Sequence, residues 1–359
     1  MYKQLFHFEP PRGWMNDPNG LCFFGGKYHI FYQHNPYSLH WDKMHWGHAV
    51  SDDLIYFDNR PIALYPDQSY ENSGGCFSGS AIEKDGRLWL FYTTVSDELG
   101  QTQSLALSDD GEHFEKYASN PIITESPSGT NIDFRDPKVN YFDEKYYMVT
   151  AGGRDGVGMI FLHESDDLIH WGDPRIIFSG SEYGRVLECP DFYKDGDNYF
   201  LTFSMMENRP WRVITLVGDF DGKQFFPRKR FDTEQGPDYY APQSFWDGKR
   251  RISFGWICDF RPDRPRSDIR TGALTVPREV TYDGEILRHF PIEEYRGMLT
   301  TSDPHVRISG NTLTLFDGRR EIATRELDRI DSVHILRDLN IIEVFINGGE
   351  YTATFWYYD

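Results

Sequence analysis

Three short motifs in the sequence combine an acidic residue with a proline one or two residues later. They read WMNDPNG at residues 14–20, FRDPK at 134–138 and ECPD at 188–191, and they contribute Asp17, Asp136 and Glu188. Clusters of Asn, Asp, Pro and Gly are typical of solvated turns. The first motif instead lies between Trp14-Met15 and the apolar run at 21–24. A rigid turn in such surroundings could present a carboxylate to a ligand.

Three carboxylates in one site could serve two kinds of chemistry. Carboxylate oxygens are preferred ligands of hard cations such as Ca²⁺. In glycoside hydrolysis, one carboxylate attacks or stabilises the anomeric carbon, and a second, held protonated, releases the leaving group. Glu188 follows the apolar run RVL and precedes Cys189-Pro190, whereas two Asn side chains flank Asp17 and can donate hydrogen bonds. We therefore expect Glu188 to be the acid/base and Asp17 the ionised nucleophile.

The residues near these motifs favour a sugar as the ligand. Aromatic faces stack on the apolar C–H faces of sugar rings, and amide, hydroxyl and guanidinium groups can bind sugar hydroxyls. With 9 Trp, 22 Tyr and 27 Phe, most aromatic residues must belong to the core, but Trp41 lies among polar residues in SLHWDKMHW. Trp46 and Tyr240 also lie near strand starts. The candidate ligand-contacting residues are Trp14, Asn16, Gln33, Trp41, Phe77, Ser78, Arg135 and Trp256.

A repeat of just over 50 residues must position these motifs. The stretches SDDLIYF, SDDGEHF and SDDLIHW begin at Ser51, Ser108 and Ser165, and hairpin turns followed by aromatic or β-branched runs are predicted five times. These turns are centred on Gly26, Gly86, Glu144, Gly196 and Gly248. Helical periodicity is nearly absent. Five all-β units that cannot each bury both faces of a sheet predict a five-bladed β-propeller over residues 1–295.

The repeat also predicts where the acids lie. About eight residues before each hairpin turn a strand begins, and these starts contain Asp17, Ser78, Asp136, Glu188 and Ala241. Since the first strand of each blade lines the central channel, we expect the three acids at equivalent positions that converge in one funnel. The alternative, that each acid caps its own turn, fits Asp17 and Asp136 but not Glu188, because Glu is a poor turn capper.

Composition excludes several classes of partner. The 56 Asp and Glu outnumber the 37 Lys and Arg, which gives a formal net charge of −19. Such a surface repels nucleic acid and anionic membranes. The N-terminus has no long apolar core, and no stretch approaches the ~20 apolar residues of a membrane span. The four cysteines form no CxxC pair, so we expect buried thiols and a cytoplasmic protein rather than a disulfide framework.

The motifs together resemble those of glycoside hydrolase family 32, the β-fructofuranosidases. The resemblance rests on WMNDPNG, FYQHNP, MHWGHAVS, FSGSA, FRDPK, ECPD, GPDYYAPQSF and GALTVPRE, in family order through all five predicted blades. It implies a propeller followed by a β-sandwich, and a retaining double displacement without a cofactor or metal. It also implies that Asp17 is the nucleophile, Glu188 the acid/base and Asp136 the transition-state stabiliser that binds fructose hydroxyls. The positions that would contact the fructosyl unit are Asn16, Gln33, Trp41, Phe77, Ser78 and Arg135, and Trp256 matches an aromatic residue on the rim of the pocket.

Two features depart from this resemblance. The stretch RPDRPRSDIR before GALT is basic, with Arg261, Arg264, Arg266 and Arg270. It predicts either a solvated loop, which base rates favour, or a site for a phosphorylated or longer aglycone.

The second departure is the tail at 296–359, which is shorter than the family's usual sandwich and has room for roughly four to six strands. Its strands NIIEVFI and YTATFWYY are apolar. We therefore expect an exposed face and edge that pair in a homodimer, with packing against the chain's own propeller as the alternative.

Three functions remain open from the sequence. The leading one is a hydrolase that releases fructose from sucrose, sucrose 6-phosphate or short fructo-oligosaccharides. A fructosyltransferase would use the same three acids with a sugar instead of water as the acceptor. A catalytically silent sugar-binding propeller is the third, although a lectin has no need of a buried, protonated Glu.

Overall fold

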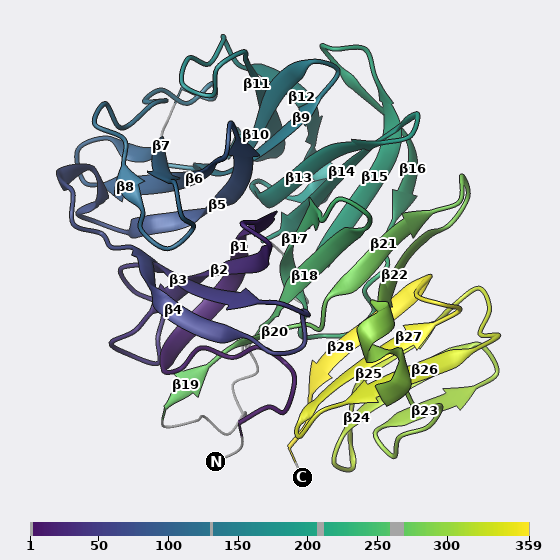
Figure 1. The fold of residues 1–359 in the computed structure, drawn as a ribbon. Coiled ribbons are helices and arrows are strands. Elements are labelled where there is room, and N and C mark those ends of the chain that lie inside the picture. Colours follow the sequence, from purple (N-terminus) through teal and green to yellow (C-terminus); the bar gives the residue numbers. More distant parts are fainter. Residues whose placement is uncertain (1–2, 130–131, 207–211, 259–268, 359) are drawn as a thin grey trace.

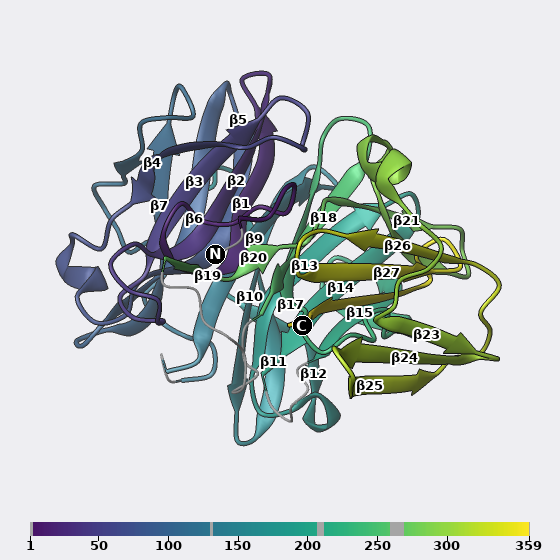
Figure 2. The same cartoon turned by 90° about the horizontal axis from the view of Figure 1, so that it is seen from below.

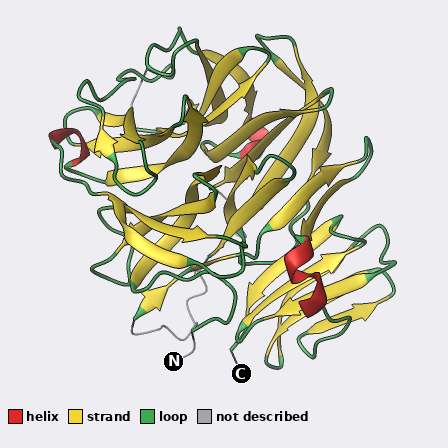
Figure 3. Ribbon diagram, in the orientation of Figure 1, coloured by secondary structure: helices red, strands yellow, loops and turns green. Residues whose placement is uncertain are grey.

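The computed structural model describes residues 3–129, 132–206, 212–258 and 269–358, and its regular structure is almost entirely β-strand (Figure 3). Five sheets are arranged around a central channel as the blades of a propeller (Figure 1). The expected all-β, five-bladed architecture is therefore confirmed. None of the helices in the described part of the chain is long and apolar enough to cross a bilayer.

The first three blades follow one another along the chain. Blade 1 contains β1 (Gly13–Phe24), β2 (Lys27–Asn35), β3 (His45–Ser51) and β4 (Asp58–Leu64). Blade 2 contains β5 (Gly75–Lys84), β6 (Arg87–Ser96), β7 (Gly100–Ser108) and β8 (Glu115–Lys116), and η1 (Ser69–Glu71) precedes it. Blade 3 contains β9 (Phe134–Phe142), β10 (Lys145–Arg154), β11 (Val157–Ser165) and β12 (Arg175–Gly180), and η2 (Ser181–Tyr183) follows it.

The last two blades close the ring. Blade 4 contains β13 (Leu187–Asp195), β14 (Asn198–Met205), β15 (Arg212–Phe220) and β16 (Phe225–Phe231). Blade 5 contains β17 (Tyr240–Trp246), β18 (Arg251–Ile257), β20 (Ala273–Leu274), β21 (Arg278–Tyr282) and β22 (Leu287–Pro291). The short strand β19 (Arg270–Thr271) leaves blade 5 and pairs in parallel with the start of β1, so the chain itself joins blade 5 to blade 1.

The turns predicted from the repeat occupy the same place in every blade. Each predicted hairpin turn joins the first strand of a blade to the second, and each central residue has a positive φ, including the non-glycine Glu144 at 64°. The Ser-Asp-Asp stretches follow the third strands of blades 1 to 3. In them Ser51, Ser108 and Ser165 accept a hydrogen bond from the N–H three residues later. The repeat is therefore a repeat of turn chemistry as well as of strands.

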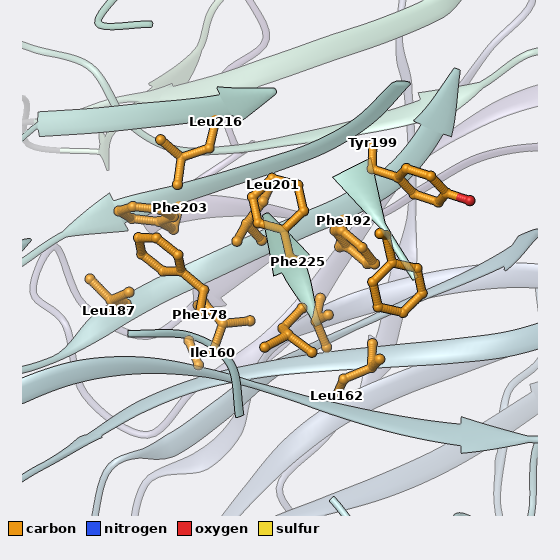
Figure 4. Packing of buried hydrophobic residues seen from close by; sticks show 14 of the residues in the cluster. Ile160, Leu162, Phe178, Leu187, Phe192, Tyr199, Leu201, Phe203, Leu216 and Phe225 are labelled. Atoms are coloured by element: carbon orange, nitrogen blue, oxygen red, sulfur yellow. The ribbon is translucent and has the colours of Figure 1, made fainter. Parts of the chain in front are cut away.

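Aromatic and aliphatic side chains fill the spaces between blades. The interface of blades 3 and 4 shows this in Figure 4, where Ile160 and Phe178 of blade 3 meet Phe192 and Leu201 of blade 4. Such contacts hold each blade at a fixed angle to the next, because a close-packed interior resists shifts of even one methylene group. The inner strands are thereby fixed around the channel.

The C-terminal residues form a small sandwich of two three-stranded sheets. One sheet contains β23 (Val306–Ser309), β24 (Thr312–Asp317) and β25 (Arg320–Glu326), and the other contains β26 (Val333–Arg337), β27 (Ile341–Ile346) and β28 (Tyr351–Trp356). Figure 2 shows the two sheets as separate layers, and a shared core joins them. The helix η3 (Glu293–Met298) includes residue 295, after which the sequence predicts the domain boundary. This boundary stays a prediction.

The expectation that the C-terminal strands leave an exposed apolar face is wrong. Every residue of β27 is buried, because one face of the sheet packs on β23–β25 and the other on the propeller, where Ile341 and Trp356 meet Ile257 of blade 5. The edge of β28 is covered by hydrogen bonds from residues 233–238, and the edge of β26 by Thr300. The homodimer stays a prediction, but the exposed apolar face and edge on which it was based are not present in the described part of the chain.

A buried charged network joins the N-terminal segment to this sandwich. The backbone N–H groups of Leu5, Phe6 and His7 donate to the carboxylate of Asp338 at 2.8–3.0 Å. The His7 ring bridges Asp338 and Glu343, at 3.0 and 2.9 Å. Burial opposes a charge on His7, but the hydrogen bonds and charges of the two acids outweigh it and raise its pKa to about 9. The network therefore fastens the chain ahead of blade 1 to the sandwich.

Candidate active site

The predicted site residues line a single cavity of about 480 Å³ at one end of the channel. All eleven predicted residues line this cavity: Asp17, Asp136, Glu188, Trp14, Asn16, Gln33, Trp41, Phe77, Ser78, Arg135 and Trp256. Sequence reasoning missed Gln101, Asp133 and Met206, and left Tyr240 out of the site although it lies at a strand start. Of the two other aromatic residues noted near strand starts, Tyr240 thus lines the cavity, whereas Trp46 is fully buried in the core.

A β-bulge in the first strand of each blade presents these side chains. In all five blades two residues of the first strand oppose one residue of the second, at 16–17, 77–78, 136–137, 189–190 and 241–242. Asp136, Cys189 and Ala241 have positive φ values of 63°, 48° and 50°. Bulges re-aim side chains and commonly lie next to active sites. The Asp-Pro and Cys-Pro dipeptides seen in the sequence mark these bulges.

The strand register corrects one expectation about the acids. In blade 4 the bulge begins at Cys189, which therefore corresponds to Asp136 in blade 3. Glu188 lies one residue earlier and corresponds to Arg135 and Tyr240 in the neighbouring blades. The three acids converge as expected, but Glu188 does not occupy the position equivalent to Asp136. Asp17 is not equivalent to Asp136 either, because it is the second bulge residue of blade 1. The cause is that the bulge begins ten residues before Gly26 in blade 1, eight before Glu144 in blade 3 and seven before Gly196 in blade 4, so a fixed spacing from the turns does not align the acids.

Asp17 faces the cavity and is otherwise enclosed by protein. Its Oδ2 accepts a 2.6 Å hydrogen bond from the Ser78 hydroxyl, and the Cys189 thiol lies 3.5 Å from the same oxygen. Burial raises the pKa of Asp17, the nearby charge of Glu188 adds to the rise, and the hydrogen bonds from Ser78 and Asn16 oppose it. Of the two flanking Asn residues expected to donate, only Asn16 contributes.

Asp136 is the most enclosed of the three acids, with 5% of its surface exposed. Its Oδ2 accepts a hydrogen bond from the Cys189 N–H at 2.8 Å, and its own N–H donates to Thr93 Oγ1 of blade 2 at 2.9 Å. Burial raises the pKa of Asp136 to about 7, against the opposing charge of Arg135 and with the added repulsion of the other two acids. A carboxyl group with this pKa can exchange a proton near neutral pH.

Polar groups surround Glu188, contrary to the expectation of apolar neighbours. Its Oε1 accepts hydrogen bonds from Arg135 Nη2 and Nε at 3.0 and 3.2 Å, and its Oε2 accepts one from the Tyr240 hydroxyl at 2.6 Å. Arg135 is held in turn by Asp133 at 2.9 Å and Gln101 at 3.2 Å. The expectation that Glu188 has apolar surroundings is therefore wrong, because its hydrogen-bond partners come from the blades on either side.

Aromatic rings form the rest of the cavity wall. Trp14 and Trp256 lie edge to face with ring centroids 5.8 Å apart, and Trp14 Nε1 donates to Asn16 Oδ1 at 2.8 Å. Trp41 and Phe77 make a similar pair at 5.7 Å, and Trp41 remains 51% exposed. Paired rings of this kind are rigid and offer flat apolar surfaces. The cavity thus combines three carboxyl groups with surfaces suited to sugar rings.

Other predictions about the chain have mixed outcomes. The four cysteines are buried and form no disulfide, as expected. Arg261, Arg264 and Arg266 lie outside the described residues, whereas Arg270 belongs to β19 and lies 3.9 Å from Glu9. Among the described residues, no group of three or more His, Cys, Asp or Glu side chains is placed to hold a metal ion.

Comparison with known proteins identifies the family. Residues 7–291 match the model of the glycosyl hydrolases family 32 N-terminal domain. The sucrose-6-phosphate hydrolase of Escherichia coli is 37% identical over 86% of this chain and 68% of its own length, and the levanase of Bacillus subtilis is 35% identical over 84% of this chain and 48% of its own. The GH32 beta-fructofuranosidase of Bombyx mori covers the whole chain with a TM-score of 0.87 and 25% identity, over 89% of that protein. As its motifs predict, the chain belongs to glycosyl hydrolase family 32 and is a glycoside hydrolase whose relatives are β-fructofuranosidases.

Proposed function

We propose that the protein releases a terminal β-D-fructofuranosyl unit by a double displacement that retains the anomeric configuration. The observation that carries the proposal is the convergence of Asp17 of blade 1 and Glu188 of blade 4 in one cavity lined with aromatic rings. Two carboxyl groups that flank a glycosidic bond are the common equipment of glycosidases. Family membership supports the same reaction.

In the first step, an oxygen of the Asp17 carboxylate attacks the anomeric carbon of the fructosyl unit. The bond between that carbon and the glycosidic oxygen breaks, and protonated Glu188 gives its proton to the departing oxygen. The Ser78 hydroxyl holds Asp17 through Oδ2, which limits the rotation of the nucleophile. The products of this step are a fructosyl ester on Asp17, an ionised Glu188 and the released aglycone.

In the second step, Glu188 takes a proton from water, and the water oxygen attacks the same carbon. The ester bond to Asp17 breaks and its carboxylate is restored. Arg135 and Tyr240 donate hydrogen bonds to both oxygens of Glu188, so they stabilise the ionised form that acts as the base.

Asp136 is proposed as the stabiliser that binds fructosyl hydroxyls. It lines the same cavity as the other two acids, and the Cys189 N–H fixes its orientation. Because its pKa is about 7, its charge depends on pH over the range in which many hydrolases work. Hydrogen bonds that it makes to the sugar become stronger as positive charge develops on the ring in the transition state.

The substrate class we propose is sucrose and short fructo-oligosaccharides, with sucrose 6-phosphate as an additional candidate. The names of the relatives, a sucrose-6-phosphate hydrolase and a levanase, support both ends of this range. Among the described residues that line the cavity, Arg135 carries the only positive charge, and Glu188 and Asp133 already bind it. A phosphate would therefore need cations beyond those described residues.

A fructosyltransferase remains the second candidate, because transfer uses the same first step and differs only in the acceptor. A catalytically silent sugar-binding protein is less well supported, since three interacting carboxyl groups add electrostatic repulsion that binding alone does not require. Product analysis at high sucrose concentration separates hydrolysis from transfer.

The decisive test combines site variants with stereochemistry. Asp17→Ala and Glu188→Ala should each lower kcat/KM by more than about a hundredfold, or roughly 2.7 kcal/mol of transition-state stabilisation. The control is Asp52→Ala, which changes an exposed acid that pairs with Lys27 outside the site. NMR of the first-formed sugar should show retained configuration. Either an inverted product or near-normal turnover by the Asp17 variant refutes the mechanism.

We also infer a cytoplasmic location. The support is that the four cysteines are buried and form no disulfide, because a reducing compartment keeps thiols reduced. Fractionation of cells that produce the protein at its natural level, followed by immunodetection, tests this; recovery in a secreted fraction contradicts it.

A further inference from the structure

A second pocket lies beside the catalytic cavity, on the rim of blade 1. Its volume is about 380 Å³, and it is lined by Asn35, Tyr37, Ser38, Asp42, Lys43, His45, Tyr65, Pro66 and Asp67. We call it the rim pocket. None of its lining residues belongs to the catalytic cavity or takes part in the proposed reaction.

The strand register places the rim pocket at the same end of blade 1 as the nucleophile. Asn35 pairs with Trp14, His34 with His45, and Trp46 with Leu64. The ends of β2 and β4 and the start of β3 therefore lie in a row that begins beside the motif of Asp17. The rim pocket occupies this row, farther out along the blade than the catalytic cavity.

One loop forms a wall of both sites. Residues 36–44 join β2 to β3, and this loop carries Trp41, which lines the catalytic cavity, followed directly by Asp42 and Lys43, which line the rim pocket. Trp41 is 51% exposed. The two sites are therefore lined by consecutive residues of one loop, and a chain that extends out of the catalytic cavity across the Trp41 ring would approach the rim pocket.

The chemistry of the rim pocket suits a sugar. The rings of Tyr37 and Tyr65 each lie edge to face with His45, at 5.6 Å between centroids. Tyr37 is 75% exposed and Tyr65 45%, so both offer ring surface to a ligand. Ser38, Asp42 and Lys43 add a hydroxyl, a carboxylate and an ammonium group that can bind sugar hydroxyls.

Both walls of the rim pocket are fixed before any ligand arrives. Asn35 binds the Ser38 hydroxyl and the His40 carbonyl and accepts the Tyr37 N–H, at 2.9–3.1 Å. On the other side, Lys116 binds the Tyr65 carbonyl and the Asp67 carboxylate. A preformed site loses less conformational entropy on binding than a mobile one.

We propose that the rim pocket is a distal sugar subsite, which binds the inner units of a β-fructoside oligosaccharide whose terminal fructosyl unit occupies the catalytic cavity. The inference rests on the proposed function and extends it to substrate length. The substrates that use this subsite are trisaccharides and longer chains, because a disaccharide ends before the rim pocket.

The test compares substrate lengths within each variant. Tyr37→Ala, Tyr65→Ala and the double variant are assayed with sucrose, kestose and a fructose-terminated tetrasaccharide. The measured quantity is the ratio of kcat/KM for the tetrasaccharide to that for sucrose. We expect this ratio to fall about fivefold in each single variant, since one lost aromatic contact is of that order, and further in the double variant.

Tyr56→Ala is the matched control. Tyr56 is 73% exposed and follows β3, at the opposite end of blade 1, so its substitution should leave the ratio unchanged. An unchanged ratio in the Tyr37 and Tyr65 variants overturns the inference, as does an equal loss on every substrate. A change of particle mass by light scattering in the double variant also overturns it, by pointing to a protein contact. Failure of the wild type on all fructosides contradicts the proposed function instead.

Discussion

The hydrogen bond from Ser78 to Asp17 gives a measurable handle on the nucleophile. Ser78→Ala removes a 2.6 Å bond from a hydroxyl group that is almost fully buried. That bond favours the ionised carboxylate and lowers the pKa of Asp17, against the rise that burial causes. Its removal should raise this pKa further, so that a higher pH is needed to ionise the nucleophile. The acid limb of the pH profile should therefore move to higher pH.

The size of the shift follows from the strength of the bond. Hydrogen bonds to charged groups contribute about 1.5–3 kcal/mol, and 1.36 kcal/mol corresponds to one pKa unit. We expect the acid limb to move up by at least about one unit. Because Asp17, Asp136 and Glu188 repel one another, the observed limb belongs to the coupled group rather than to Asp17 alone.

The assay is kcat/KM for sucrose from pH 4 to pH 8, with wild type and variant measured side by side. Ser73→Ala, a change at an exposed serine just ahead of β5, should leave the limb in place. An unmoved limb in Ser78→Ala, or one moved to lower pH, refutes the reasoning. A uniform loss at every pH would show that Ser78 acts only by positioning.

Three further outcomes are expected. For Asp136→Asn, the folded-state pKa of about 7 exceeds the unfolded value of 3.8, so the stability that protonated Asp136 contributes is present below about pH 4 and is lost as pH rises through 7. The Tm of the variant relative to that of the wild type should therefore rise over that range. A Tm difference that stays constant with pH would contradict this. His7 has its pKa raised from 6.5 to about 9. The loss of unfolding free energy that His7→Gln causes, measured in urea, should therefore be largest below pH 6.5 and shrink as pH passes 9. A loss that grows with pH would show that His7 stabilises the fold in its neutral form. Glu188→Ala should recover part of its activity on a β-fructoside whose leaving group is a good one, because acid assistance then matters less; equal impairment on both substrates would remove the acid role.

The sequence predicted the framework of the fold because the repeat is local. The hairpin turn at Glu144 was predicted in spite of its missing glycine, since its place in the repeat is defined by the strands around it. The aromatic residue Trp41 was placed in the cavity because polar neighbours in sequence made a core position improbable. Short-range patterns thus sufficed for the blades, their inner strands and eleven of the residues that line the cavity.

What escaped prediction depends on contacts between blades. The register of Glu188 depends on where the bulge begins in its strand, and its partners Arg135 and Tyr240 are contributed by other blades. Sequence neighbours such as Leu187 and Cys189 therefore gave the wrong electrostatic surroundings. The apolar strand β27 was expected to be exposed, because the propeller face that covers it is formed by residues far away in the chain.

The buried network around His7 has a consequence for the order of folding. The hydrogen bond from the His7 N–H to Asp338 spans 331 residues, so the segment that leads into blade 1 is synthesised long before its partners. Contacts of such long range slow folding, since the chain must close a large loop before they form. The five blades can assemble one by one as they leave the ribosome, but the N-terminal segment can be fastened only after β27 exists. Fastening of residues 5–7 to the sandwich is therefore a late event, and synthesis interrupted before β27 would leave a propeller whose N-terminal segment is unsecured.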